Sequence, residues 1–372
     1  MASNDSGRAP IYFPGLDGLR FMAFLLVFFT HFSVNSSMPF WYQANYVGWT
    51  GVNLFFVLSA FLLTRLAVEE TRRDGRVSIK RFYIRRVLRI WPLYYGYIIA
   101  YFVYLCIRHN MFPMLWARFL GLVTFTDNIW SAVTNSWNYS YFAHLWSLSM
   151  EEQFYFFLPL LIPLLVKVNK KTQLILGGTV LIFLLSLRVI AVALHQETPF
   201  VRALPISGDA FIIGILLGLG TFDQPLKRVH PIVKMLIGFA LLYSLTFMPF
   251  IDEVRYAQIV AFPISAVSGG LMIDAIANHS NRILDVLYGN RVVRYLGKIS
   301  FGLYVYHFSV TRIIDTHFAQ WTGMENPTAV FYIKMALGFL ITVLVSTASY
   351  ELYEKHFLKL KKRFTVIASR PL

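Results

Sequence analysis

Charged residues and cysteine are scarce in this 372-residue chain. Asp, Glu, Lys and Arg make up 14% of the residues, whereas an ordinary soluble domain carries about 25%, and this difference argues against a soluble enzyme. The single cysteine, Cys106, excludes an intrachain disulfide framework or a metal cluster built from cysteines. The sequence also has no internal repeat, no low-complexity segment and no cleavage pattern after its first apolar run, so we expect no cleavable signal peptide.

Hydrophobic residues, by contrast, are abundant. They account for 57% of the chain, and 34 Phe, 21 Tyr and 8 Trp argue against disorder. Apolar runs of about 17–25 residues recur, and each is long enough to cross a bilayer as a helix. The sequence therefore predicts an all-α, polytopic membrane helix bundle with about ten transmembrane helices. The predicted spans are residues 19–36, 48–66, 90–107, 146–166, 172–194, 208–222, 235–250, 259–276, 299–318 and 329–352.

The basic residues determine the predicted orientation. A net charge of +15 would suggest nucleic-acid binding in a soluble protein. Here 27 of the 34 Lys and Arg fall in segments assigned to the cytoplasm, and four fall in the opposite loops. This bias predicts cytoplasmic termini, and contact of the basic surface with anionic lipids or an anionic cytosolic ligand rather than nucleic acid. The predicted parts are a cytoplasmic segment 1–18, a transmembrane domain 19–352 and a basic cytoplasmic tail 353–372.

Arg20 and His31 form the first candidate pair. They lie 11 residues apart in the first predicted span, which places both on one helix face, about 16 Å apart along the axis. An ionisable side chain near the middle of a membrane is unfavourable, so His31 is a candidate functional residue. A histidine that is only hydrogen-bonded within the bundle is the alternative.

Arg86 and Arg89 form the second pair. They are three residues apart at the cytosolic start of the third span, so they project from adjacent turns of one face. Paired guanidinium groups near the positive end of a helix dipole suit phosphate groups. Anchoring to lipid headgroups is the alternative.

Glu151 and Glu152 lie in the outer half of the fourth predicted span. Carboxylates there should face the bundle or a wet cavity. One of them is suited to orient His31 or to receive an acceptor hydroxyl, and an ion pair with Arg188 is the alternative. Hydrogen bonding or packing within the bundle is our interpretation of the weaker polar positions, Asp209, Ser300, Tyr304 and His307.

Five segments occur in the order LDGLRFMAFLLVFFTH, GVNLFFVLSAFLLT, RRVLR, WSLSMEEQFYFFLP and YLGKISFGLYVYHFSV. Together they resemble the acyltransferase-3 family of bacterial membrane acyltransferases, and they run from residue 15 to about residue 310. The positions that match the family's arginine-to-histidine spacing, its arginine-x-x-arginine element and its fourth-helix glutamate are Arg20, His31, Arg86, Arg89 and Glu151.

Three positions depart from the family pattern. Asn53 stands where an acidic residue is usual, Ala60 where glycine is usual, and Ser207 where arginine is frequent. These departures leave residues 53, 60 and 207 without a predicted role in the site. Because about 20 residues follow the last predicted span, we expect the stand-alone type, without the SGNH-type domain of longer members.

The resemblance implies transfer of an acyl group, commonly acetyl from acetyl-CoA, to a hydroxyl of a cell-surface or lipid-linked carbohydrate, such as a polysaccharide or lipopolysaccharide. It implies an enzyme of the inner membrane that needs no metal. Arg86 and Arg89 would hold the phosphates of acyl-CoA. His31 would act as general base or form an acyl-histidine, while Glu151 fixes the imidazole or the acceptor. Arg20 would supply positive charge to the donor channel or the oxyanion.

Other functions stay open at this stage. A proton-coupled transporter of acyl groups or lipid-linked sugars would also use buried His, Arg and Glu, although the sequence shows no inverted repeat. A scaffold that binds partners through its loops leaves the intramembrane charges without a purpose. Among acyltransferases, a small cytosolic natural product is the alternative acceptor. A carbohydrate is preferred because the outer stretch 108–145 is rich in Trp and Tyr, which can stack on sugar rings.

Overall fold

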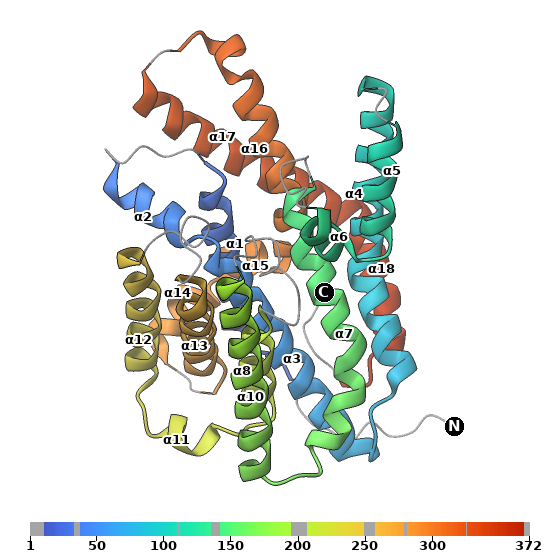
Figure 1. Ribbon diagram of the computed structural model, residues 1–372, viewed down its shortest axis with the longest axis vertical. Helices are drawn as coiled ribbons and strands as arrows, with labels where there is room; N and C mark the ends of the chain where they lie inside the picture. The colour runs from blue at the N-terminus through green and yellow to red at the C-terminus, as the bar shows by residue number, and fades with distance from the viewer. Residues whose placement is uncertain are drawn as a thin grey trace.

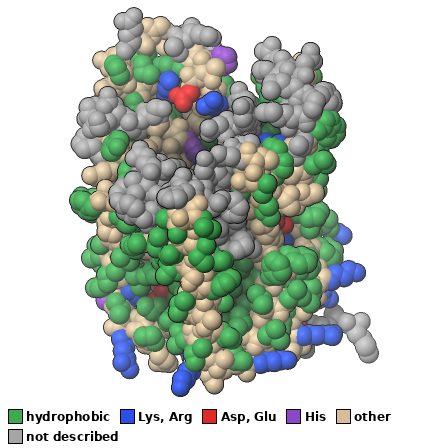
Figure 2. All heavy atoms as spheres, viewed as in Figure 1, with side chains coloured by type: hydrophobic (Ala, Val, Ile, Leu, Met, Phe, Trp, Pro, Cys, Tyr) green, Lys and Arg blue, Asp and Glu red, His purple; other side chains and the backbone are tan. Residues whose placement is uncertain are grey.

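The computed structural model describes residues 11–32, 38–109, 112–134, 142–194, 207–248, 257–278, 281–324 and 326–367, and every regular element within these ranges is a helix. In Figure 1, α3, α7, α8 and α10 run along the long axis of the molecule, while α16 and α17 extend to its upper end. Lys and Arg side chains gather mainly at the lower end of the face drawn in Figure 2, below a broad hydrophobic belt.

The helices follow one another in the order α1 (Pro14–Thr30), α2 (Pro39–Val47), α3 (Thr50–Asp74), α4 (Ile79–His109), α5 (Phe112–Val123), α6 (Asp127–Thr134), η1 (Ala143–Leu145), α7 (Trp146–Leu165), α8 (Lys170–Ala193), α10 (Asp209–Gly218), α11 (Asp223–Lys227), α12 (Pro231–Ser244), η3 (Leu245–Phe247), α13 (Ala257–Ala277), α14 (Arg282–Gly289), α15 (Arg291–Lys298), α16 (Ser300–Thr322), α17 (Pro327–Ser349), η4 (Tyr350–Glu354), α18 (Lys355–Lys361) and η5 (Lys362–Phe364).

Six helical segments within the described residues are long and apolar enough to cross a membrane. They are Thr50–Asp74, Ile79–Ile107, Ala143–Leu165, Lys170–Ala193, Ala257–Ala277 and Pro327–Phe364. Two shorter apolar helices, Asp209–Gly218 and Pro231–Phe247, add to them. The all-helical, multi-pass bundle is thus confirmed. Each of the ten predicted spans falls at least partly on a helix, but the number ten and the cytoplasmic termini stay predictions.

The α1 helix lies in the centre of the bundle and packs against α3, α14, α15 and α16. Its contact with α15 is made through the backbone, because a Cβ atom on Gly297 would lie 1.7 Å from the carbonyl oxygen of Asp17. A Cβ atom on Gly18 would likewise lie 2.3 Å from the carbonyl oxygen of Tyr288. Small residues permit such close approach of helices, and here they hold the first turns of α1 firmly in place.

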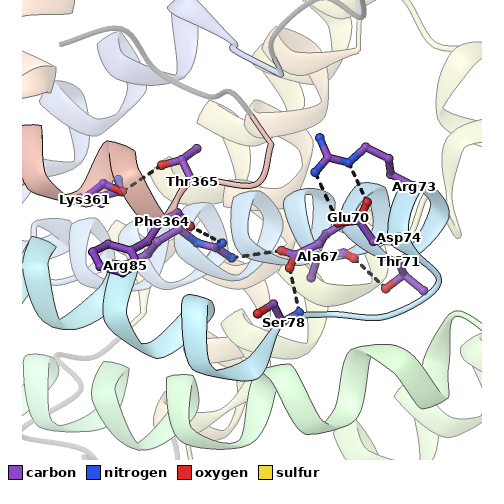
Figure 3. A network of polar contacts seen from close by, with 10 residues as sticks. All are labelled: Ala67, Glu70, Thr71, Arg73, Asp74, Ser78, Arg85, Lys361, Phe364 and Thr365. Atoms are coloured by element: carbon purple, nitrogen blue, oxygen red, sulfur yellow. Dashed lines mark hydrogen bonds and ion pairs between the residues drawn. The ribbon is translucent and has the colours of Figure 1, made fainter. Parts of the chain in front are cut away.

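The C-terminal segment is attached to the hairpin formed by α3 and α4 (Figure 3). Arg85 donates hydrogen bonds to the Glu70 carboxylate and to the carbonyl oxygen of Phe364, both at 3.1 Å. The other carboxylate oxygen of Glu70 accepts a hydrogen bond from the backbone N–H of Ser78 at 2.8 Å. These contacts bring Lys361, at the end of α18, beside α3 and α4.

The contact between α3 and α10 also depends on glycine. A Cβ atom on Gly214 would lie 2.5 Å from the Cβ of Ala60 and 2.6 Å from the carbonyl oxygen of Val57. We expect Gly214→Ala to force the two helices apart and to destabilise the bundle by about 1–3 kcal/mol, the usual range for overpacking. Thermal unfolding in detergent measures this effect.

The matched control is Gly178→Ala on α8, where an added Cβ atom meets nothing within 4 Å. Both substitutions gain the same helix propensity, so the difference between their melting temperatures isolates the packing term. Equal melting temperatures would contradict the predicted role of Gly214.

Candidate active site

A cavity lies among α1, α3, α4, α7 and α16 and brings together four of the five predicted site residues. Arg20 comes from α1, Arg86 and Arg89 from α4, and Glu151 from α7. Tyr12 and Lys361 line one end, and Ser147 and Tyr304 line the end toward the C-terminus of α1. Residues from six parts of the sequence, Lys361 of α18 included, thus line one chamber in which several charged side chains meet apolar ones.

The arginine pair on α4 has no acidic partner in contact. Neither Arg86 nor Arg89 makes a hydrogen bond or ion pair with any residue that the structure describes. The Arg86 guanidinium lies 5.8 Å from the centre of the Tyr155 ring, and its Nε atom is buried without an acceptor. Two planar groups of donors that lack acceptors are suited to bind an anion with several oxygen atoms.

Other buried cations in the bundle are paired. Arg188 on α8 forms an ion pair with Asp209 on α10, and Lys234 on α12 forms one with Asp274 on α13. The pairing of Arg188 excludes its use as the partner of Glu151 and confirms that Asp209 hydrogen-bonds within the bundle. Against this pattern, the two arginines on α4 are exceptional.

A further ion pair shows how strongly burial acts even on paired groups. Arg118 on α5 lies 3.3 Å from Asp127 on α6. Burial nevertheless raises the pKa of the Asp127 carboxyl to about 6, although the positive charge of Arg118 opposes this shift. An arginine without any such partner is still less favourable in this environment.

Arg20 and Glu151 are both held by neighbouring groups. Arg20 donates to Asp17 at 2.7 Å, and Asp17 also accepts from Tyr12 at 2.9 Å. Glu151 accepts hydrogen bonds from the hydroxyls of Ser59 on α3 and Tyr155 on its own helix. Both hydroxyls donate to Oε1, which is therefore held inside the cavity, whereas the adjacent Glu152 accepts from Trp91 at 3.3 Å.

His31 lies outside this cavity. It caps the C-terminus of α1, where it is half-buried, and its ring centre lies 5.1 Å from that of His307 and 4.8 Å from that of Phe308. His144, in η1, lies 5.4 Å from His307. The structure thus separates His31 from the other four predicted residues and places it in a cluster of three histidines.

Tyr304 forms the boundary between the cavity and the histidine cluster. Its hydroxyl shares a hydrogen bond with Ser147 and donates to the carbonyl oxygen of His144 at 2.8 Å. Its ring lies 5.6 Å from that of His144 and 5.5 Å from that of His307, centre to centre. A single aromatic ring therefore separates the end of the cavity from the histidines.

Two residues of this cluster, His144 and His307, have no predicted role in the site from the sequence. His307 was interpreted as a packing residue, and His144 was not singled out. One signal was available for His144, because it precedes Glu151 by seven residues, close to two helical turns, and so faces the same side. For His307, only the fold reveals that α16 carries it to the end of α1.

Comparison with known proteins gives a consistent assignment. The model of a family described as an acyltransferase domain, Acyl_transf_3, matches residues 13–349. O-acetyltransferase OatA of Staphylococcus aureus, from strain NCTC 8325 / PS 47 and from strain COL, is 27% identical over 380 residues, which cover 98% of this chain and 60% of each relative. The chain therefore spans less than two thirds of these relatives. No solved structure matches it significantly.

The pairing pattern predicts opposite effects of two arginine substitutions on stability. We expect Arg188→Gln to lower the free energy of unfolding by about 3–5 kcal/mol, because it leaves Asp209 buried without its cation. Arg89→Gln should leave stability nearly unchanged or raise it, because no hydrogen bond or ion pair with a described residue is lost and Glu354 acts on Arg89 only from a distance. Thermal unfolding of both variants in one detergent checks this, and equal losses would show that Arg89 has a structural partner.

Proposed function

This chain belongs to the acyltransferase-3 family, and on that premise we propose that it transfers an acyl group, acetyl, from acyl-CoA to a hydroxyl of a cell-surface or lipid-linked carbohydrate. It would do so as a multi-pass enzyme of the inner membrane. The observation that carries the proposal is the unpaired Arg86 and Arg89 in a cavity that ends beside the histidine cluster.

The donor would enter at the end of the cavity lined by Lys361 and Tyr12. Coenzyme A carries several phosphate groups, and two guanidinium groups without internal acceptors are suited to bind them. Predicted orientation places this end at the cytoplasm, where acyl-CoA is available. Lys361 would add positive charge at the entrance.

The acyl group would lie toward Tyr304. Arg20 and His31 are 11 residues apart on α1, which corresponds to about 16 Å along the helix, and an extended pantetheine arm has a length of the same order. A thioester at this depth would lie one aromatic ring away from the histidines. Transfer then requires movement of the Tyr304 side chain.

His31 would act as the general base. It takes the proton of the acceptor hydroxyl, the hydroxyl oxygen attacks the thioester carbon, and the departing thiolate takes the proton from His31. Arg20, which lies about 16 Å from His31 along α1, would add positive charge to the donor channel. Glu151, fixed by Ser59 and Tyr155, would balance the charges of Arg20 and Arg86 across the cavity without direct contact. An acyl-histidine intermediate is the competing route through the same residue.

The acceptor would approach from the side opposite to the donor. The names of the similar Staphylococcus aureus proteins support acetyl as the transferred group. Trp116 on α5 and Trp130 on α6, in the aromatic stretch between α4 and α7, offer ring faces suited to stack on sugars. A small cytosolic alcohol as acceptor, or transport without turnover, are outcomes that the following experiment distinguishes.

The test measures thiol release from acetyl-CoA by the purified chain in detergent, with a membrane extract as the source of acceptors in one arm and soluble alcohols in the other. We expect His31→Ala to reduce turnover by about a hundredfold or more while acetyl-CoA binding is kept. The double variant Arg86→Ala, Arg89→Ala should weaken acetyl-CoA binding by about tenfold or more, because it removes charge-assisted hydrogen bonds.

The control for charge removal is the double variant Arg72→Ala, Arg73→Ala, which changes two exposed arginines at the end of α3 that do not line the cavity. It should bind acetyl-CoA as the wild type does. Full turnover by His31→Ala would overturn its catalytic role. Absence of acetyl-CoA binding by the wild type would favour the transporter, and release only with soluble alcohols would favour the cytosolic acceptor.

A further inference from the structure

The histidine cluster contains two buried ring nitrogens that have no hydrogen-bond partner. His144 is 4% exposed and His307 is fully buried. Nδ1 of His144 and Nε2 of His307 lack a partner among the residues that the structure describes. Buried polar atoms are almost always satisfied, so these two atoms, on rings whose centres lie 5.4 Å apart, call for an explanation.

The opposite nitrogen of each ring determines its protonation. Nε2 of His144 lies 3.1 Å from the carbonyl oxygen of Val305, and Nδ1 of His307 lies 2.6 Å from the carbonyl oxygen of Tyr304. Because a carbonyl oxygen only accepts, each of these nitrogens carries the hydrogen. A second proton on either ring would bury an unpaired charge. Both rings are therefore neutral, and each unpartnered nitrogen presents a lone pair.

A lone pair of this kind is satisfied by a donor or by a metal ion. Within the described part of the chain, no group of three or more His, Cys, Asp or Glu has an arrangement suited to hold a metal. Hydrogen donors remain. The three histidine rings adjoin one another, since the ring centre of His307 lies 5.1 Å from that of His31 and 5.4 Å from that of His144. A ligand with neighbouring donors that entered this cluster would therefore meet both lone pairs beside His31.

We propose that His144 and His307 bind the hydroxyl groups of the acceptor and hold one of them against His31. The inference rests on the proposed function and adds the residues that hold the acceptor: two acceptor nitrogens on neighbouring rings fit a compound with two neighbouring hydroxyls, as in a sugar, better than a simple alcohol. The reacting hydroxyl gives its proton to His31, its oxygen forms the bond to the acyl carbon as the C–S bond breaks, and the thiolate leaves as the thiol.

Paired substitutions separate this binding role from a structural one. In His144→Gln, the amide nitrogen takes the place of Nε2, so the hydrogen bond to the carbonyl oxygen of Val305 is kept and the lone pair at the Nδ1 position is lost. In His144→Asn, the shorter side chain keeps an acceptor oxygen at the Nδ1 position but loses the hydrogen bond to Val305. In His307 it is Nδ1 that donates to a carbonyl oxygen and Nε2 that lacks a partner, so the two substitutions exchange roles. His307→Asn keeps the hydrogen bond to the carbonyl oxygen of Tyr304 and loses the lone pair, whereas His307→Gln keeps an acceptor at the Nε2 position and loses that hydrogen bond. Each site thus supplies its own matched control.

The experiment uses the full chain in membranes of the producing cells, with radiolabelled acetyl-CoA, and measures transfer into alkali-labile esters. Melting temperature and acetyl-CoA binding are recorded for every variant. We expect His144→Gln and His307→Asn to keep wild-type melting temperatures and acetyl-CoA affinity but to lose transfer by about tenfold, because each removes one hydrogen bond to the acceptor. His144→Asn and His307→Gln should retain more transfer despite lower melting temperatures.

The opposite order overturns the inference. In that case His144→Gln and His307→Asn transfer the acetyl group as well as the wild type does, and only the variants with lowered melting temperatures lose transfer. The two histidines then have only a structural role, and the proposed function stands. If acetyl-CoA affinity falls in these two variants, the cluster belongs to the donor site instead. A wild-type chain that binds acetyl-CoA but transfers no label counts against the proposed function and, with it, this inference.

Discussion

The arrangement of this bundle depends on one constraint: a charge buried in an apolar environment needs a compensating charge. Arg188 and Lys234 meet that requirement with carboxylates on the neighbouring helices, and they thereby join α8 to α10 and α12 to α13. Arg86 and Arg89 make no hydrogen bond or ion pair within the described residues, and carboxylates act on them only from a distance, Glu151 on Arg86 and Glu354 on Arg89. Direct ion pairs therefore join helices in one half of the bundle, whereas in the other half two guanidinium groups line a cavity.

A single helix connects the two halves of the candidate site. Near its start, α1 carries Arg20 into the cavity, and at its end it carries His31 to the histidine cluster. Its position is fixed by backbone contacts that only glycine permits, with α15 at Gly297 and with the end of α14 at Gly18. The distance between the arginine chamber and the histidines is therefore set by a rigid element and not by loops.

Sequence reasoning predicted the helical bundle because apolar length is a local property that needs no knowledge of packing. Spacing along helices and motif order also selected Arg20, Arg86, Arg89 and Glu151, which line one cavity in the structure, but they selected His31 with them, which lies outside it. Sequence reasoning did not predict the contact between His144 and His307, which are 163 positions apart in the chain. That contact, and the boundary at Tyr304, follow from how helices pack and have no local signature.

The attachment of the C-terminal segment has a consequence for synthesis. Tyr304 and Lys361 line opposite ends of the cavity and are among its last residues to be translated, and Arg85 holds the turn after Lys361 through the carbonyl oxygen of Phe364. The helices that supply the arginines are inserted long before these two. A growing chain therefore lacks the parts of the cavity wall that Tyr304 and Lys361 supply until its final helices have been translated, so the complete cavity forms only late in synthesis.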